Sequence, residues 1–331
     1  MAVYRFEAGE RSSVKSDNQI FFYDHAPPMV DYSREVLEGL LSPAKYISPK
    51  FFYDEYGSEL FTEITQQPEY YLTVTETQLL RSHAKQISGL IGDEIVLIEY
   101  GSGSSTKIRI LLENLRPAIY APLDISKDYL VQASRMLAEE YPWLEVHASC
   151  VDFTTRLDLP FHSDKRRVGF FPGSSIGNFE PAQASSFLAQ VRELVGDDGA
   201  LLLGVDLVKD VDILNSAYND AAGVTRLFNL NVLRHLNEVY GTNFVLSRFE
   251  HQAFFDAEQG CIQMYLVSEV DQVVDVGGQS ISIRAGERIH TENSYKYTVD
   301  QIKLMAASAG FRNAHVWVDT AELFGLFYLS A

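Results

Sequence analysis

The sequence predicts an α/β protein made of a doubly wound, mostly parallel sheet with one antiparallel strand near its edge, and a second α+β lobe. Three observations predict this. From Glu94 onward, short apolar runs alternate with longer amphipathic stretches, the pattern of βα units in a parallel sheet. The alternation stops after Asp206 and returns near Val299. The last two predicted strands are too close in sequence for a crossover helix, so they should pair antiparallel.

Five apolar runs are predicted to be parallel strands, because each is short and β-rich or apolar on both faces. They are residues 95–100, 118–123, 144–150, 168–171 and 200–205. Helices are predicted between them at residues 106–115, 127–140 and 181–194. Ahead of the first strand, Thr73 and Glu76 have capping-box spacing before apolar residues at helical intervals, so a helix is predicted to begin there.

The second lobe is predicted from a change of pattern after the fifth strand. A long helix-like tract at 213–239 precedes strand-like segments at 263–274 and 279–283. A helix at 299–309, ended by Gly310, and strands at 314–318 and 324–329 then complete the sheet. We therefore assign residues 74–207 and 297–331 to the sheet domain. Residues 20–73 and 208–296 are assigned to the second lobe, and 1–19 to an N-terminal tail.

Composition excludes several functional classes. The chain has 27 basic and 45 acidic side chains, a net charge of −18, which repels nucleic acid and anionic membranes. Cys150 and Cys261 cannot form a disulfide framework, and the histidines show no ligand-type pair, so no metal is expected. The sequence contains no long apolar run and no signal-peptide pattern. We expect a cytoplasmic monomer.

A glycine turn after the first strand predicts a nucleotide-type cofactor. Gly101 and Gly103 permit positive φ and a close backbone approach, and the following helix adds free N–H groups. Such turns also occur where nothing binds. Thr106 stands where a dinucleotide fingerprint has its third glycine, which disfavours a pyrophosphate cofactor and hence a nicotinamide oxidoreductase.

Acidic residues follow the next two strands. Asp124 ends the second strand and can accept hydrogen bonds from ribose hydroxyls. Asp152 and Phe153 follow the third strand and suit the amino group and ring face of adenine, although Asp152 could equally be a local cap. Three such features after three successive strands predict one nucleoside site.

Several segments, in order along the chain, resemble the histidine-specific, S-adenosylmethionine-dependent methyltransferase family. They are residues 51–54, 57–61, 68–71, 171–179, 203–210, 217–225 and 291–294. The resemblance extends from about Tyr46 to the C-terminus. It implies a Rossmann-like class I methyltransferase sheet and S-adenosylmethionine as cofactor. It also implies methylation of the α-amino nitrogen of free L-histidine to its trimethyl betaine, hercynine, in ergothioneine biosynthesis.

The resemblance also implies residue roles. The cofactor-binding residues are Tyr53, Gly101, Ser102, Gly103, Lys107 and Asp124, to which the strand ends add Asp152 and Phe153. The substrate-binding residues are Tyr70, Gly173, Ser175, Asn178, Tyr218, Met264, Glu292 and Ser294. Asn178 and Tyr218 match residues that hold the amino and carboxylate end, and Tyr70, Glu292 and Ser294 match those around the imidazole. Asn178 and Tyr53 are the expected catalytic residues. Family members often have Leu in place of Tyr100 and Thr in place of Ser175.

The implied chemistry is physically consistent. Methyl transfer is an in-line displacement that needs alignment and a neutral amine, and burial beside a sulfonium favours the neutral amine. Asn178 would then orient the nitrogen without a strong base. Glu292 and Ser294 can accept from and donate to the two ring nitrogens of an imidazole.

Other interpretations stay open at the level of sequence. The enzyme could methylate tyrosine or another amino acid, as relatives with a different residue at the Met264 or Glu292 position could. Alternatively, the chain could be a non-enzymatic module that binds a nucleoside or an amino acid. Glu292 and Ser294 could lie in a surface turn, and Tyr70 and Met264 could be ordinary core. Asn178 could be a helix cap. The number of methyl groups added is not determined by the sequence.

Overall fold

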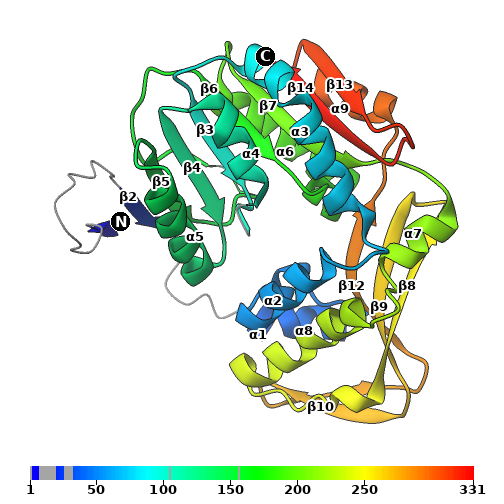
Figure 1. The fold of residues 1–331 in the computed structure, drawn as a ribbon. Helices are drawn as coiled ribbons and strands as arrows, with labels where there is room; N and C mark the ends of the chain where they lie inside the picture. Colours follow the sequence, from blue (N-terminus) through cyan, green and yellow to red (C-terminus); the bar gives the residue numbers. More distant parts are fainter. Residues whose placement is uncertain (1, 7–19, 26–32, 104–105, 156) are drawn as a thin grey trace. The chain divides into compact units, whose positions relative to one another are not determined.

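The computed structural model describes residues 2–6, 20–25, 33–103, 106–155 and 157–331, and the chain divides into two compact units (Figure 1). The first, which we call the sheet unit, comprises Met1–Pro28, Val74–Leu207 and Tyr297–Ala331. The second unit comprises Met29–Thr73 and Val208–Lys296. Each unit is therefore assembled from separate stretches of the chain.

The sheet unit contains a nine-stranded sheet in the order β1-β2-β5-β4-β3-β6-β7-β14-β13. The strands are β1 (Ala2–Phe6), β2 (Ile20–Asp24), β3 (Val96–Tyr100), β4 (Ile119–Asp124), β5 (Glu145–Cys150), β6 (Arg167–Phe171), β7 (Ala200–Asp206), β13 (Asn313–Val318) and β14 (Phe324–Ser330). Strands β2 to β7 are parallel to one another, whereas β14 is antiparallel to both β7 and β13, and β1 is antiparallel to β2. The predicted α/β sheet with one reversed strand near its edge is confirmed.

The N-terminal residues differ from the prediction. Residues 20–24, which were expected in the second lobe, form β2 and pair in parallel with β5 from Ile20↔Val146 to Asp24↔Cys150. Residues 2–6 were expected in a tail but form β1, antiparallel to β2. The apolar run Ile20–Tyr23 covers an edge of the sheet that would otherwise expose unpaired backbone groups. Residues 7–19 of the predicted tail lie outside the described residues.

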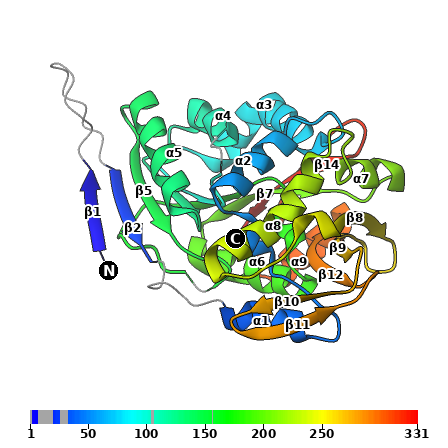
Figure 2. The ribbon, with the colours of Figure 1, turned by 90° about the horizontal axis from the view of Figure 1, so that it is seen from below.

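Helices cover both faces of the sheet. The strand order reverses at β3, with β4 on one side and β6 on the other, and right-handed crossovers therefore place the linking helices on opposite faces. Figure 2 shows α3 (Tyr71–Ile91), α4 (Thr106–Leu115) and α5 (Lys127–Glu140) on one face, and α6 (Pro181–Val195) and α9 (Val299–Ser308) on the other. All residues of β3 and β7 are buried. In folds of this kind, ligands bind outside the carboxyl ends of the strands at such a reversal, which here are the ends of β3 and β6.

The start of α3 was predicted wrongly. The helix begins at Tyr71, so Thr73 and Glu76 lie inside it. The Glu76 carboxylate accepts hydrogen bonds from Lys107 and from the backbone N–H of Gly173. Thr73 and Glu76 therefore have the spacing of a capping box but do not cap the helix. None of the described helices is long and apolar enough to cross a membrane.

The second unit has a three-stranded antiparallel sheet in the order β12-β9-β8 and a separate hairpin, β10-β11. Its strands are β8 (Phe249–Asp256), β9 (Cys261–Ser268), β10 (Gln272–Val276), β11 (Gln279–Ile283) and β12 (Arg288–Tyr295). The predicted strand 263–274 is thus parts of two strands, β9 and β10. Helix α8 (Val224–Tyr240) packs on β8 and β9 and contacts α2 (Glu55–Ile64). The remaining elements are α1 (Ser33–Leu41), α7 (Val211–Ala217) and the short 3₁₀ helices η1 (Pro49–Phe52) and η3 (Leu246–Arg248).

The predicted helical tract 213–239 is two helices, α7 and α8, joined by residues 218–223. Gly223 has a φ of 73°, which stops a continuous helix. The Asp220 carboxylate accepts from the N–H groups of Val224 and Thr225 at 2.8 Å each, so it satisfies the N-terminus of α8. The break places Tyr218 at the end of α7.

Candidate active site

The glycine turn follows β3 in the sheet unit. Gly101 and Gly103 have φ of 67° and 43°, a region that favours glycine. The N–H of Gly101 donates to the Leu123 carbonyl at 2.9 Å, which ties the turn to β4. Ser102 is buried, and its Oγ has no hydrogen-bond partner among the described residues. Ser104 and Ser105 lie outside the described part of the chain. The turn therefore offers a buried, unsatisfied hydroxyl where the cofactor is expected.

Asp124 lies beside this turn at the end of β4. Its carboxylate accepts from the N–H of Gly103 at 3.2 Å and from that of Ser126 at 2.9 Å. Burial raises the pKa of Asp124, and these backbone hydrogen bonds oppose the rise. The structure thus brings together Gly103 and Asp124, and holds the predicted ribose acid at a defined position.

Two further carboxylates at this edge were missed by the sequence analysis. Glu76 is fully buried, ion-pairs with Lys107 and accepts from the N–H of Gly173 at 2.9 Å and 3.0 Å. Glu99, near the end of β3, is buried and accepts a hydrogen bond from Tyr120 Oη. Burial raises the pKa of Glu99 to about 8, the Tyr120 hydrogen bond and the Lys107 charge lower it, and Asp124 raises it.

These acids give the edge an electrostatic preference. The charges of Asp124 and Glu76 raise the pKa of Glu99, and the Lys107 ammonium opposes them. Acids in such excess favour a cationic ligand. A signal for Glu99 was present in the sequence, because it stands two residues before Gly101 at a strand end. Glu76 carried only a misleading signal, the spacing of a cap.

The residues after β6 form a tight turn next to the same network. Gly173 has a φ of 78° and Ser174 a φ of 59°, and Ser174 Oγ accepts from the N–H of Asp206 at 2.9 Å. Ser175 donates to the Pro172 carbonyl at 3.1 Å and begins the 3₁₀ helix η2 (Ser175–Asn178). Asn178 ends that helix and is half-buried. Through Glu76, the structure brings the predicted substrate residue Gly173 together with the predicted cofactor residue Lys107.

Asp152 and Phe153 follow β5. Asp152 is exposed, and its Oδ1 accepts from Thr154 N at 3.0 Å and Thr154 Oγ1 at 2.6 Å. This is the local role that the sequence left open for it, and contact with adenine stays a prediction. The Phe153 ring lies edge-on to Tyr100 and would be 3.8 Å from a Cβ on Gly101. Phe153 therefore lies against the glycine turn, and its contact with adenine stays a prediction.

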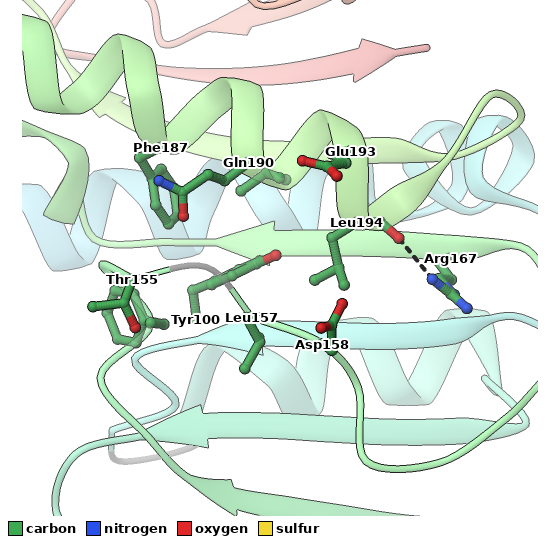
Figure 3. A pocket seen from close by; sticks show the side chains of 11 residues that line it. Tyr100, Thr155, Leu157, Asp158, Arg167, Phe187, Gln190, Glu193 and Leu194 are labelled. Atoms are coloured by element: carbon green, nitrogen blue, oxygen red, sulfur yellow. Dashed lines mark hydrogen bonds between the residues drawn. The ribbon is translucent and has the colours of Figure 1, made fainter. Parts of the chain in front are cut away.

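A cavity of about 150 Å³ opens beside Phe153 in the sheet unit (Figure 3). Its wall combines Phe187 and Leu194 of α6 with Leu157 and Asp158. Tyr100 extends into it from β3, and the Tyr100 Oη is buried without a hydrogen-bond partner among the described residues. Burial raises the pKa of Tyr100. The end of β3 therefore buries a polar group against this cavity.

In the second unit, three polar side chains form a closed hydrogen-bonded triangle. Tyr218 Oη donates to Ser294 Oγ at 2.8 Å, and Lys296 Nζ donates to each of these oxygens at 2.9 Å. The Lys296 ammonium also lies 4.8 Å from the centroid of the Tyr218 ring. Lys296 is only 3% exposed. Sequence reasoning missed Lys296, although the alternation of a strand places residues 292, 294 and 296 on one face.

Glu292 and Met264 are directly opposite each other on β12 and β9. Both are buried. Burial raises the pKa of Glu292 to about 7, and the charge of Lys296 lowers it. Tyr70 is also buried, with its ring edge-on to Tyr218 at a centroid distance of 6.4 Å. The predicted imidazole residues therefore gather in this unit, and the surface-turn interpretation of Glu292 and Ser294 is wrong.

A histidine in the same unit makes a hydrogen bond to the backbone carbonyl of Tyr218. His251 on β8 contacts the Tyr218 carbonyl through Nε2 at 3.0 Å and Asn229 Nδ2 through Nδ1 at 2.8 Å. Because the amide nitrogen donates, Nδ1 must accept and Nε2 must carry the hydrogen. Burial lowers the pKa of His251. A neutral His251 thus positions the residue that closes the triangle.

Tyr53 belongs to the second unit and lies edge-on to Phe61 and Phe228, with centroids at 6.0 Å and 5.9 Å. Its contact with the cofactor and its catalytic role stay predictions. The contacts of the neighbouring residues Asp54 and Gly57 explain why these residue types occur next to Tyr53. Asp54 accepts from the N–H of Gly57 at 2.8 Å and ion-pairs with Arg234 at 2.7 Å. A Cβ on Gly57 would lie 1.7 Å from the Phe52 carbonyl oxygen, so only glycine fits there.

Comparisons with known proteins identify the family of this chain. A profile described as "Histidine-specific methyltransferase, SAM-dependent" matches residues 32–331. The histidine N-alpha-methyltransferase of Mycolicibacterium smegmatis is 40% identical over 299 residues, which cover 88% of this chain and 92% of that protein. The histidine N-alpha-methyltransferase of Mycobacterium tuberculosis is 36% identical over 300 residues, with the same two coverages, 88% and 92%.

Among solved structures, an S-adenosylmethionine-dependent methyltransferase from Clostridium acetobutylicum aligns with a TM-score of 0.46 at 11% identity, over 82% of this chain and 98% of that chain. The family profile covers most of the sequence, and its match includes the glycine turn, the acid-rich edge and the β12 face described above. The chain therefore belongs to the histidine-specific, S-adenosylmethionine-dependent methyltransferase family.

Proposed function

We propose that this protein transfers methyl groups from S-adenosylmethionine to the α-amino nitrogen of L-histidine, with hercynine as the product. The observation that carries the proposal is the buried face of β12, where a carboxylate and a hydroxyl stand two residues apart beside Tyr218 and Met264. The similarity to two histidine N-alpha-methyltransferases over 88% of the chain supports it.

The β12 face suits an imidazole ring. A neutral imidazole has one N–H donor and one bare nitrogen acceptor, which Glu292 and Ser294 would match by accepting and donating. Met264 and Tyr70 would supply the apolar walls, since both are buried in this unit. A leucine or phenylalanine side chain could not hydrogen-bond to Glu292 or Ser294, and sites built to hydrogen-bond a ring N–H reject such analogues strongly.

The sheet unit contains donors and acceptors that fit the cofactor. S-adenosylmethionine supplies, when bound, an electrophilic methyl group on a positively charged sulfur. Gly101, Gly103 and the unsatisfied Ser102 hydroxyl would hold it at the turn, Asp124 would accept from its ribose, and Phe153 would contact its adenine. Lys107 keeps Glu76 and the Gly173 turn in place through the ion pair described above. The acidic edge favours a cationic ligand over a phosphate-bearing one.

Asn178 and Tyr53 are proposed to act on the amine. The side-chain oxygen of Asn178 would accept from the amino group and orient its lone pair, while Tyr53 would help to align it. Burial next to a positive sulfur favours the neutral amine. An in-line displacement at carbon depends mainly on such alignment, so no residue of the chain is assigned as a covalent nucleophile.

Mass spectrometry of reaction mixtures tests this function. Purified protein is incubated with S-adenosylmethionine and an equimolar mixture of L-histidine and L-tyrosine, and both amino acids are followed over time. We expect histidine to gain successive methyl groups and tyrosine to stay unchanged. Methylation of tyrosine alone would replace histidine with the alternative substrate, and methylation of neither would overturn the proposal.

A further inference from the structure

A fully buried glutamate connects separate segments of the sheet unit. Glu76 of α3 ion-pairs with Lys107 of α4. Its two carboxylate oxygens also share the backbone N–H of Gly173, at 3.0 Å and 2.9 Å. A Cβ on Gly173 would lie 3.5 Å from Lys107 Nζ, so the ammonium and the turn after β6 are themselves close. Buried charges need paired and hydrogen-bonded partners, and Glu76 therefore ties the predicted cofactor residue Lys107 to the predicted substrate residue Gly173.

Strand β7 leaves the space that this carboxylate occupies. A Cβ on Gly204 would lie 2.1 Å from Glu76 Oε1 and 3.1 Å from Phe324 Cε1. The backbone of Gly204 is that of a regular strand, paired with Leu326 of β14. No turn therefore requires glycine here, and a glycine inside a strand often marks the close approach of another group. The glycine is explained by the carboxylate that lies against it.

The turn after β6 needs such a restraint. Gly173 has a φ of 78° and Ser174 a φ of 59°. A residue other than glycine in this region costs energy and persists where its surroundings hold it. Ser174 Oγ accepts from the N–H of Asp206, and Glu76 accepts from the N–H of Gly173. The chain then enters η2, which ends at Asn178, so Glu76 restrains the start of the segment that carries Asn178.

We propose that Glu76 is a positioning residue, which holds the Lys107 ammonium for the cofactor and the 173–178 segment for the substrate amine. The part that concerns Asn178 rests on the proposed function, whereas the part that concerns Lys107 requires only cofactor binding. A lysine side chain is long and flexible, and a ligand that immobilises it bears an entropic cost. The ion pair with Glu76 orders Lys107 before the cofactor arrives and so removes much of that cost.

A double-mutant cycle on cofactor binding tests the Lys107 part. Calorimetry gives the Kd of S-adenosylmethionine for the wild type, Glu76→Gln, Lys107→Met and the double variant. Glutamine keeps the shape but has no charge and one acceptor oxygen, so Kd should rise about tenfold in Glu76→Gln. In the Lys107→Met background the same substitution should change Kd less than about threefold, because no ammonium is left to hold. Glu113→Gln, on the exposed surface of α4, is the matched control.

A merely structural role for Glu76 would change Kd equally in both backgrounds. That result, or unchanged or tighter binding by Glu76→Gln, would overturn the inference. Gly204→Ala is a second, independent variant, because its methyl group displaces the carboxylate but leaves the charge in the chain. It should also weaken cofactor binding, and binding equal to that of the wild type would count against a positioning role of the carboxylate.

The turnover number tests the Asn178 part. At saturating cofactor and histidine, kcat of Glu76→Gln should be at least about tenfold below that of the wild type, since in-line transfer depends on alignment. An unchanged kcat would remove the 173–178 segment from the inference. If the wild type does not methylate histidine at all, the proposed function fails, while the calorimetric cycle still decides whether Glu76 acts through Lys107.

Discussion

Replacement of Glu99 by glutamine should make the protein less sensitive to rising pH. Glu99 is 2% exposed, and its pKa in the folded protein is about 8, against 4.5 for an unperturbed side chain. Between these values the folded state holds a proton that the unfolded chain has lost, so the free energy of unfolding falls as pH rises. At about 1.4 kcal/mol per pH unit, the expected loss between pH 6 and pH 8 is on the order of 2–3 kcal/mol. A glutamine does not ionise and removes this loss, while its side-chain oxygen can still accept from Tyr120.

Urea unfolding at pH 6 and pH 8, followed by tryptophan fluorescence, measures this effect in the sheet unit, because Trp143 and Trp317 both belong to it. The free energy of unfolding should fall less between pH 6 and pH 8 in Glu99→Gln than in the wild type. The difference between the two proteins should be on the order of the 2–3 kcal/mol loss given above. Glu94→Gln, an exposed glutamate just before β3, is the matched control and should behave as the wild type. An equal pH dependence in Glu99→Gln and the wild type would refute the reasoning.

The same carboxylate links proton release to cofactor binding. A positive charge placed near Glu99 should lower its pKa, so S-adenosylmethionine binding near pH 8 should release a proton. Calorimetry in buffers of different ionisation enthalpy detects this release, and Glu99→Gln should abolish it while weakening binding. Equal proton release by the variant and the wild type would assign the proton to another group.

Three further substitutions test separate parts of the site. Gly103→Val places a branched side chain at a φ of 43° and should weaken S-adenosylmethionine binding at least about tenfold by calorimetry; unchanged affinity would mean that the turn does not hold the cofactor. Tyr100→Phe removes a buried hydroxyl without a partner and should raise the free energy of unfolding by about 1 kcal/mol, which a loss of stability in urea would contradict. Below pH ~6.5 the unfolded chain protonates His251 while the folded chain keeps it neutral, so the free energy of unfolding falls as the pH falls. His251→Gln should remove this contribution to the fall. Matching urea midpoints of His251→Gln and the wild type across pH 5.5–7.5 would count against that role.

The errors of the sequence analysis have identifiable physical causes. Thr73 and Glu76 have the spacing of a helix cap, but packing directs the Glu76 carboxylate to Lys107 and Gly173. The tract 213–239 is helical in periodicity, yet the αL conformation of Gly223 divides it; that glycine was a readable signal. Residues 20–24 lie 126 residues before their partners on β5, from Ile20↔Val146 to Asp24↔Cys150, and no local pattern identifies a partner at such a distance.

The amino-acid sequence alone was sufficient for the order of the βα elements, the reversed strand and the glycine turn. These features follow from periods of 2 and 3.6 residues and from backbone demands of single glycines, all of which are local. The tertiary structure alone showed that Glu76 and Glu99 join Asp124, and that Lys296 donates to Tyr218 and Ser294. Burial and hydrogen-bond direction depend on which distant segments pack together, and they decide whether a polar side chain is charged, donating or accepting.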